Sequence, residues 1–165
     1  MPAAIAGAPI SLYRKEVVSN KRHLFELPPS NGWSSGYEMM LARARVALAS
    51  GTLRAILFHQ GEADVTNPRW LDEVAEVVAD LRADLNLSNE VPFIAGELVD
   101  GGCCSTHNAV INRLPDVVPN AHVVSSAGLT ATDAYHFDLA GQRELGRRYA
   151  ETFLDAVGGW RHTDQ

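Results

Sequence analysis

The stretch RAILFHQGEAD, residues 54–64, decides the fold class of this chain. An apolar run from Ala55 to Phe58 is followed at once by a histidine, an amide and two carboxylates. Such a run, bounded by polar and glycine residues, predicts a strand over 54–59 that is buried inside a parallel sheet. In sheets of this kind binding sites form at the carboxyl ends of the strands, so the polar residues that follow indicate a site.

The rest of the chain repeats this strand-then-helix order. Further strands are expected over 91–99 and 121–125. Helices are expected over 36–49, 68–85, 106–114 and 139–156, the third of them ending at Pro115 and the last capped by Asp138. Ser35 and Glu38 fit a capping box at the start of the first helix. The predicted fold class is α/β: one domain over 1–165, a three-layer α/β/α sandwich with a mainly parallel sheet.

The amino-acid composition argues against nucleic acid and membranes as binding partners of this protein. The chain has 165 residues with a net charge of −6 and a pI near 5.4, so a protein that binds nucleic acid through phosphate contacts is not expected. Its apolar runs are too short for a membrane helix, and no membrane partner is expected. The first residues, MPAAIAGAPI, lack the basic region of a signal peptide, which leaves the cellular compartment open.

Three loops are expected to meet at one edge of the sheet, over residues 59–64, 100–105 and 129–141. In the third loop Asp133 and His136 are three residues apart. At that spacing the carboxylate can accept a hydrogen bond from Nδ1 of the imidazole and leave Nε2 free. A histidine supported in this way can act as a general base and then as a general acid.

Two motifs carry a family resemblance. HQGEAD at 59–64 and DAYHFDLAGQRELGRRYAE at 133–151 resemble W-H-Q-G-E-x-D and D-x-x-H-F-x-x-x-G-Q-R-x-x-G-R-R of the SGNH hydrolase superfamily. More narrowly, they are similar to the sialate O-acetylesterase-like branch, carbohydrate esterase family 6. The resemblance covers the chain from about residue 36 to residue 150.

The resemblance implies roles for individual residues. Asp133 and His136 become the acid and the base of a catalytic triad, and Gln60 becomes an oxyanion-hole donor. Glu62 is expected to support the loop. A metal site of His59, Glu62 and Asp64 is the less favoured alternative, so no metal and no other cofactor is expected.

The nucleophile of the family does not have a counterpart in these motifs. The family carries it in a G-Q-S-N-type motif before H-Q-G-E, and this sequence has no such motif. Ser34, in GWS, does not follow an apolar strand, and Ser35 is explained by the capping box. Gly7 resembles a glycine of the family's second block, whose N–H helps to form the oxyanion hole. The domain is therefore expected to be N-terminally incomplete. Cys103 or Cys104 as a replacement nucleophile is a minor alternative.

These expectations leave two functions open. The first is a carboxylic-ester hydrolase lineage that deacetylates an O-acetylated carbohydrate, with only the Asp–His and oxyanion parts in this chain. The second is an inactive family member that binds an acylated sugar or a protein partner. Without the family's central strand, the strand over 54–59 needs another neighbour. Residues 3–7 moving inward are favoured, and a fold-back of residues 11–18 or a homodimer through the sheet edge are the alternatives.

Overall fold

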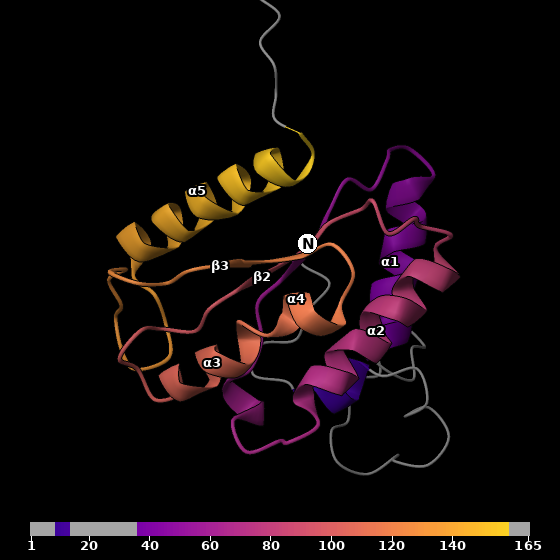
Figure 1. Cartoon of the computed structure of the whole chain (residues 1–165). Coiled ribbons are helices and arrows are strands. Elements are labelled where there is room, and N and C mark those ends of the chain that lie inside the picture. Colours follow the sequence, from indigo (N-terminus) through magenta and orange to yellow (C-terminus); the bar gives the residue numbers. More distant parts are fainter. Residues whose placement is uncertain (1–8, 14–35, 159–165) are drawn as a thin grey trace, which may run out of the picture.

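A computed structural model describes residues 9–13 and 36–158 of the chain (Figure 1). Its sheet has three parallel strands in the order β1 (Ile56–Phe58), β2 (Phe93–Gly96) and β3 (Ala121–Val124). Each strand is followed by a helix, as the sequence predicts. The strand β2 lies between β1 and β3 in the sheet, as it does in the chain. The α/β class with a parallel sheet is confirmed.

Neighbouring residues along β2 face opposite sides of the sheet. Phe93 and Ala95 belong to one buried apolar cluster, whereas Ile94, between them, belongs to a second cluster together with Val124 of β3. This alternation follows from the pleat of an extended strand. Because all four residues of β2 are buried, both faces of the sheet are covered at this strand.

The helices divide between these two faces (Figure 1). Helix α5 (Leu139–Ala156) packs on one face through Leu145. The other face is covered mainly by α2 (Trp70–Asp84). Three further helices contribute to that second layer: α1 (Gly36–Leu48), α3 (Asn108–Ile111) and α4 (Leu114–Val117). Short 3-10 helices complete the described elements: η1 (Ile10–Tyr13), η3 (Glu62–Asp64) and η4 (Ser105–His107).

The helix expected over 68–85 is confirmed as α2, which spans Trp70–Asp84. Its apolar stripe is buried in the core: Trp70, Leu71, Val74, Val77, Val78 and Leu81. The 139–156 helix has the predicted bounds, and the Asp138 carboxylate accepts a hydrogen bond from the Gly141 N–H at 2.7 Å. Val157 follows the last residue of this helix and is 37% exposed.

Two expectations about elements are wrong. The first strand is shorter than 54–59, and Leu57 at its centre is 62% exposed rather than buried. Among the strands that the structure describes, β1 lies at the edge of the sheet beside β2. The helix over 106–114 is broken into η4 and α3, and Pro115 lies in the first turn of α4 instead of ending a helix. Proline is tolerated there because the first N–H groups of a helix have no partner within it.

The N-terminal part is described only in a short piece. Ile10–Tyr13 form a 3-10 helix, so the end of the predicted strand segment AAIAGAPI and the start of SLYRKEVV are not extended. Ile10 and Tyr13 are buried in the core beside α2. Gly7, Ser34 and Ser35 lie outside the described residues. Residues 3–7, which were expected to pair with β1, lie outside them too.

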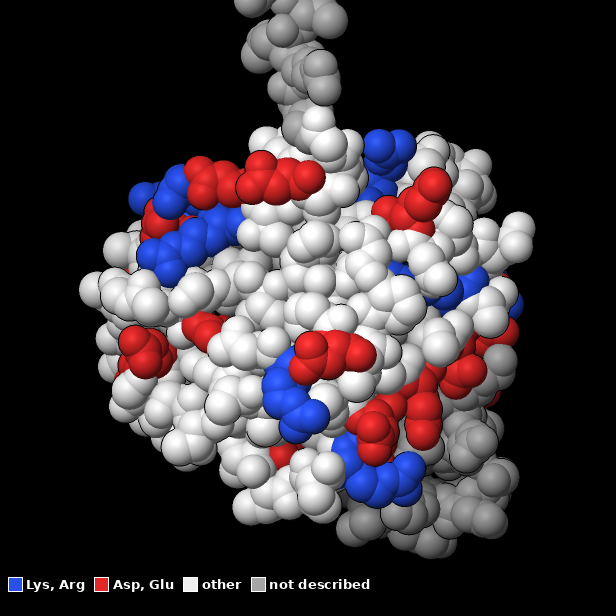
Figure 2. All heavy atoms as spheres, in the orientation of Figure 1, with Lys and Arg blue, Asp and Glu red and all other residues white. Residues whose placement is uncertain are grey.

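Charges of both signs are mixed on the surface (Figure 2). On α5, Glu144 forms ion pairs with Arg147 and Arg148, and Arg147 also pairs with Glu151. Within residues 9–13 and 36–158, no helix has both the length and the apolar character needed to cross a bilayer.

Candidate functional site

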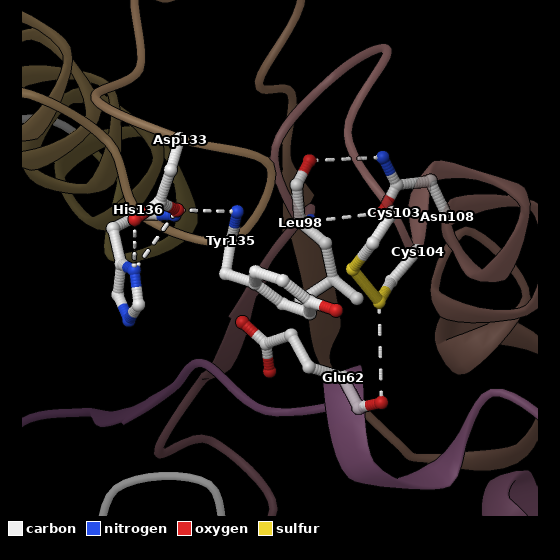
Figure 3. The surroundings of a disulfide bond; sticks show 8 residues. All are labelled: Glu62, Leu98, Cys103, Cys104, Asn108, Asp133, Tyr135 and His136. Carbon is white, nitrogen blue, oxygen red and sulfur yellow. Dashed lines mark hydrogen bonds and ion pairs between the residues drawn. A yellow bond between two sulfur atoms is a disulfide. The ribbon is translucent and has the colours of Figure 1, made fainter.

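The loop before α5 holds Asp133 and His136 in direct contact (Figure 3). Nδ1 of His136 lies 2.9 Å from Oδ2 of Asp133 and 3.0 Å from Oδ1. A carboxylate only accepts, so the hydrogen sits on Nδ1 and Nε2 is left able to take up a proton. The hydrogen bond expected from the D-x-x-H spacing is therefore present, while the catalytic roles of the two residues remain predictions.

The same carboxylate organises the turn between the two residues. Oδ1 of Asp133 accepts hydrogen bonds from the N–H of Tyr135 at 2.7 Å and from the N–H of His136 at 2.9 Å. The hydrogen bond from His136, followed by that from the Tyr135 amide, lowers the pKa of Asp133 below its ordinary value. The carboxylate thus stays ionised at neutral pH and keeps the imidazole in one orientation.

Backbone contacts close the base of this loop. The Thr132 N–H donates to the His136 carbonyl at 2.8 Å, and the Asp138 N–H donates to the Thr130 carbonyl at 3.2 Å. Gly141, in the first turn of α5, passes so close to Thr130 that a Cβ there would lie 2.1 Å from the Thr130 carbonyl oxygen. The loop is consequently a closed hairpin fixed on the helix, and His136 sits at its exposed end with a side chain that is 75% accessible.

In the loop after β1 the amide of Gln60 is held from both sides. Its Nε2 donates to Oδ2 of Asp64 at 2.5 Å, and its Oε1 accepts from Nε1 of Trp70 at 2.7 Å. Asp64 also accepts the N–H of Ile10 at 2.8 Å, which attaches η1 to this loop. These two hydrogen bonds fix the orientation of the Gln60 amide, and its role as an oxyanion donor remains a prediction.

Beneath this loop lies a buried histidine that sequence reasoning did not single out. His107 is 3% exposed and meets Trp70 edge to face, with ring centroids 4.7 Å apart. Gly61, with a φ of 154°, approaches the ring so closely that a Cβ would lie 2.8 Å from its Cδ2. Burial lowers the pKa of His107, against the opposing effect of the Asp64 and Glu62 carboxylates. The ring is thus a neutral packing partner of the Gln60 loop.

The end of β1 is tied to α5 by Tyr149. The Tyr149 hydroxyl donates to the Phe58 carbonyl at 2.5 Å, and burial raises its pKa. Gly96 of β2 lies under this hydroxyl, where a Cβ would be 2.4 Å from the oxygen. His59 packs against Phe137, with centroids 6.0 Å apart, and its surroundings lower its pKa by desolvation while Glu62 acts in the opposite direction. His59 therefore lies at the strand end, where it was expected.

The loop after β2 contains a disulfide between Cys103 and Cys104. Neither sulfur is a free thiol, so neither cysteine can be the replacement nucleophile that the sequence left as an alternative. A pair of adjacent cysteines does not reveal its redox state in the sequence, which is why the bond was missed.

The three loops do meet at one edge of the sheet. The Cys103 N–H donates to the Ala134 carbonyl at 3.1 Å, which joins the second loop to the third. The Cys104 sulfur lies 4.0 Å from the Glu62 carbonyl oxygen, which joins the second loop to the first (Figure 3). Figure 3 shows the Tyr135 ring and the Glu62 side chain between the His136 pair and the disulfide. The part of the chain that is described contains no group of His, Cys, Asp or Glu able to hold a metal ion, at His59, Glu62 and Asp64 or elsewhere.

Comparison with known families and solved structures identifies proteins to which this chain is similar. The sequence model of a family described as carbohydrate esterase, sialic acid-specific acetylesterase, matches residues 1–155. The chain belongs to this family. An X-ray structure of a protein from Arabidopsis thaliana has a similar fold, with a TM-score of 0.68 and 24% sequence identity over 90% of this chain. The chain spans 57% of the length of that protein.

The residues that follow His136 along the chain hold its loop through close packing and hydrogen bonds. In GQRELGRR, Gly141 allows the close approach to Thr130, and the Gln142 side chain donates to the Phe137 carbonyl at 2.9 Å. The Arg148 guanidinium donates to the carbonyls of Ser125 and Ala127 at 2.8 and 3.0 Å. These contacts tie the start and the middle of α5 to the loop that carries His136.

Proposed function

We propose that Asp133 and His136 form the acid–base part of a carbohydrate O-acetylesterase site. The observation that carries the proposal is the Asp133–His136 hydrogen bond at 2.9 Å, at the edge where the three loops meet. In this role Nε2 of His136 takes the proton of a nucleophilic hydroxyl as it attacks the acetyl carbonyl. The imidazolium then gives the proton to the departing sugar oxygen, while Asp133 stabilises its charge.

Gln60 is the proposed side-chain donor to the oxyanion. The hydrogen bonds from Trp70 and to Asp64 fix the plane of its amide before any substrate arrives. A donor fixed in advance needs no reorganisation when charge develops on the carbonyl oxygen, and one such donor contributes about 3 kcal/mol to transition-state stabilisation. Gly7 is the proposed source of a backbone donor, by resemblance alone.

The nucleophile is the part that the described residues do not provide. Among residues 9–13 and 36–158, no hydroxyl is hydrogen-bonded to Nε2 of His136. We therefore expect the 165-residue chain to hydrolyse p-nitrophenyl acetate poorly, since removing the serine of a triad lowers kcat by about 10⁶-fold. Turnover at an ordinary esterase rate that is lost in His136→Ala, and not in His122→Ala, would show that this chain holds its own nucleophile; Ser34→Ala and Ser35→Ala would then locate it.

A binding function is the second candidate, favoured by the same missing hydroxyl together with the exposure of His136. The protein would then recognise an O-acetylated sugar without cleaving it. Saturation-transfer NMR with an acetylated oligosaccharide and its deacetylated form tests this. Binding of the acetylated form alone, without hydrolysis over hours, supports the binding function, and equal binding of both forms contradicts it.

A further inference from the structure

The disulfide lies between the two loops that carry the proposed site residues. It follows a segment that is anchored by Asn108, whose side chain both accepts from the Leu98 N–H at 2.8 Å and donates to the Leu98 carbonyl at 3.0 Å (Figure 3). The chain then makes a tight turn at Asp100 and Gly101, closed by a hydrogen bond from the Gly102 N–H to the Val99 carbonyl at 3.0 Å. The beginning of the loop is thus fixed by hydrogen bonds and its end by the disulfide.

The two cysteines differ in their surroundings. Cys104 is 6% exposed and belongs to the main apolar core, with its sulfur against the Glu62 carbonyl. Cys103 is exposed, and its N–H donates to the Ala134 carbonyl. One half of the disulfide is therefore anchored in the core, and the other half belongs to an exposed residue whose backbone contacts the His136 hairpin.

Ala134 stands inside the turn that orients His136. The Asp133 carboxylate accepts hydrogen bonds from the N–H groups of Tyr135 and His136, and Ala134 lies between Asp133 and these two residues. Gly102 also packs against the Ala134 carbonyl, where a Cβ would be 2.4 Å from the oxygen. The hydrogen bond from Cys103 to Ala134 is the contact by which the β2 loop sets the position of this turn.

A bond between adjacent cysteines closes a small ring that contains their shared peptide. The ring restrains rotation about both side chains and about the backbone bonds between the two Cα atoms, so the position of the Cys103 nitrogen is restrained relative to the buried Cys104 sulfur. When the bond is open, the backbone of Cys103 can rotate independently of the core. We therefore expect the hydrogen bond from the Cys103 N–H to the Ala134 carbonyl to be less well fixed when Cys103 and Cys104 are reduced.

We propose that the Cys103–Cys104 disulfide is a redox-sensitive positioning element for the His136 hairpin. A dithiol reductant attacks the exposed Cys103 sulfur as a thiolate, and Cys104 leaves as a thiolate that takes up a proton. The second thiol of the reductant then displaces the Cys103 thiol and closes into a cyclic disulfide, so two electrons pass to the protein. The reduced Cys104 S–H can donate to the Glu62 carbonyl, whereas the oxidised sulfur cannot.

The first test establishes the bond and its opening. The purified protein, denatured without reductant, is expected to show no free thiol, and two after treatment of the folded protein with dithiothreitol. Hydrogen exchange of the Cys103 amide should rise by about tenfold or more on reduction, since its bond to Ala134 opens locally. Two free thiols in the protein purified under oxidising conditions, or unchanged exchange after reduction, would overturn the proposal.

The second test separates positioning of His136 from a general effect on stability. The Hε1 resonance of His136 and its pH-titration curve should change on reduction, and change in the same way in the Cys103→Ser, Cys104→Ser double variant. Dithiothreitol should have no further effect on that variant, and reoxidation of the wild type should restore the original spectrum. A lower thermal midpoint of unfolding with an unchanged His136 titration would mean a structural role only and overturns the proposal.

The consequence for catalysis rests on the proposed function, but the thiol, exchange and NMR measurements do not. Any residual turnover of the wild type should fall on reduction and return on oxidation. If the NMR changes occur and no esterase activity is found in either state, the positioning role of the disulfide stands, because the thiol, exchange and NMR measurements do not require turnover.

Discussion

Asp64 is a buried carboxylate whose contacts explain why the Gln60 loop has one conformation. It is 5% exposed and accepts the Ile10 N–H and the Gln60 amide. In Asp64→Ala the Ile10 N–H and the Gln60 amide lose their acceptor in a buried site from which water is excluded. The free energy of unfolding should therefore fall by about 3 kcal/mol. Urea unfolding followed by tryptophan fluorescence measures it, with Trp70 reporting on this loop.

The matched control is Asp116→Ala. Asp116 makes an exposed ion pair with Arg113 at 3.9 Å. A pair of that kind contributes about 0.5 kcal/mol or less, because water screens it. Similar losses in the two variants would show that the buried network at Asp64 is not what holds the loop.

His107 makes the protein sensitive to mild acid. Its folded pKa is lowered by burial from the ordinary value of 6.5, while Asp64 and Glu62 facing it act in the opposite direction. The unfolded chain then binds more protons than the folded one below about pH 6.5, so stability is greatest above this pH and is lost as the pH falls through the folded pKa. His59, whose pKa is also lowered, contributes with the same sign.

The variant His107→Phe tests how much of the loss of stability in mild acid is due to His107. Phenylalanine keeps the edge-to-face contact with Trp70, and Nε2 of His107 has no hydrogen-bond partner to lose. The free energy of unfolding of the variant should fall less steeply between pH 7 and pH 5 than that of the wild type. Parallel pH curves for the two proteins would contradict a buried, neutral His107.

At the scale of elements, the start of α5 is fixed by a glycine. A Cβ on Gly141 would collide with the Thr130 carbonyl, whereas Gly146, in the same helix, faces open space. Gly141→Ala should destabilise the protein by at least about 2 kcal/mol and shift the His136 resonances. Gly146→Ala should stabilise it by about 0.5–1 kcal/mol, as alanine loses less backbone entropy in a helix. The two thermal unfolding midpoints, measured side by side, decide between a steric role for Gly141 and a propensity effect.

The elements also show what sequence patterns can predict. The helix over 139–156 could be placed because its cap, its apolar stripe and its end each leave a local signal, as could the stripe on α2. Pro115 was misread because proline both follows helices and begins them. A three-residue strand at a sheet edge has the same apolar letters as a central one, so the exposure of Leu57 could not be predicted.

The candidate site divides in the same way. The contact of Asp133 with His136 follows from local spacing, and local geometry was enough to predict it. The bonds that hold Gln60 involve Trp70 in a helix and Asp64 in a turn, and the packing of His107 beneath them depends on the tertiary fold. No spacing in the sequence encodes such contacts, and none encodes the oxidation state of Cys103 and Cys104.

At the scale of the whole molecule, the open edge of β1 is the feature that remains to be explained. The Ile56 N–H donates toward β2, to the Pro92 carbonyl at 2.9 Å. In a parallel ladder the next residue points its backbone groups the other way, so the N–H and C=O of Leu57 face outward. Within the described part of the chain no strand pairs with that side, and the Leu57 side chain is 62% exposed.

An open edge of this kind is a template for another strand. The sequence favours residues 3–7 as that strand, and the alternative is a second copy of the chain. Because most soluble oligomers are two-fold symmetric, we predict for this alternative two β1 strands paired antiparallel. Sedimentation velocity over a wide range of protein concentration should show a dimer that dissociates on dilution, and the Leu57 amide should lose its protection from hydrogen exchange at the same dilution. Leu57→Lys should give a monomer, because a lysine at the edge of a sheet blocks pairing, while Val46→Lys, on the exposed side of α1, should leave the dimer intact. A wild type that stays monomeric at high concentration with a protected Leu57 amide would show instead that another segment of the same chain covers the edge.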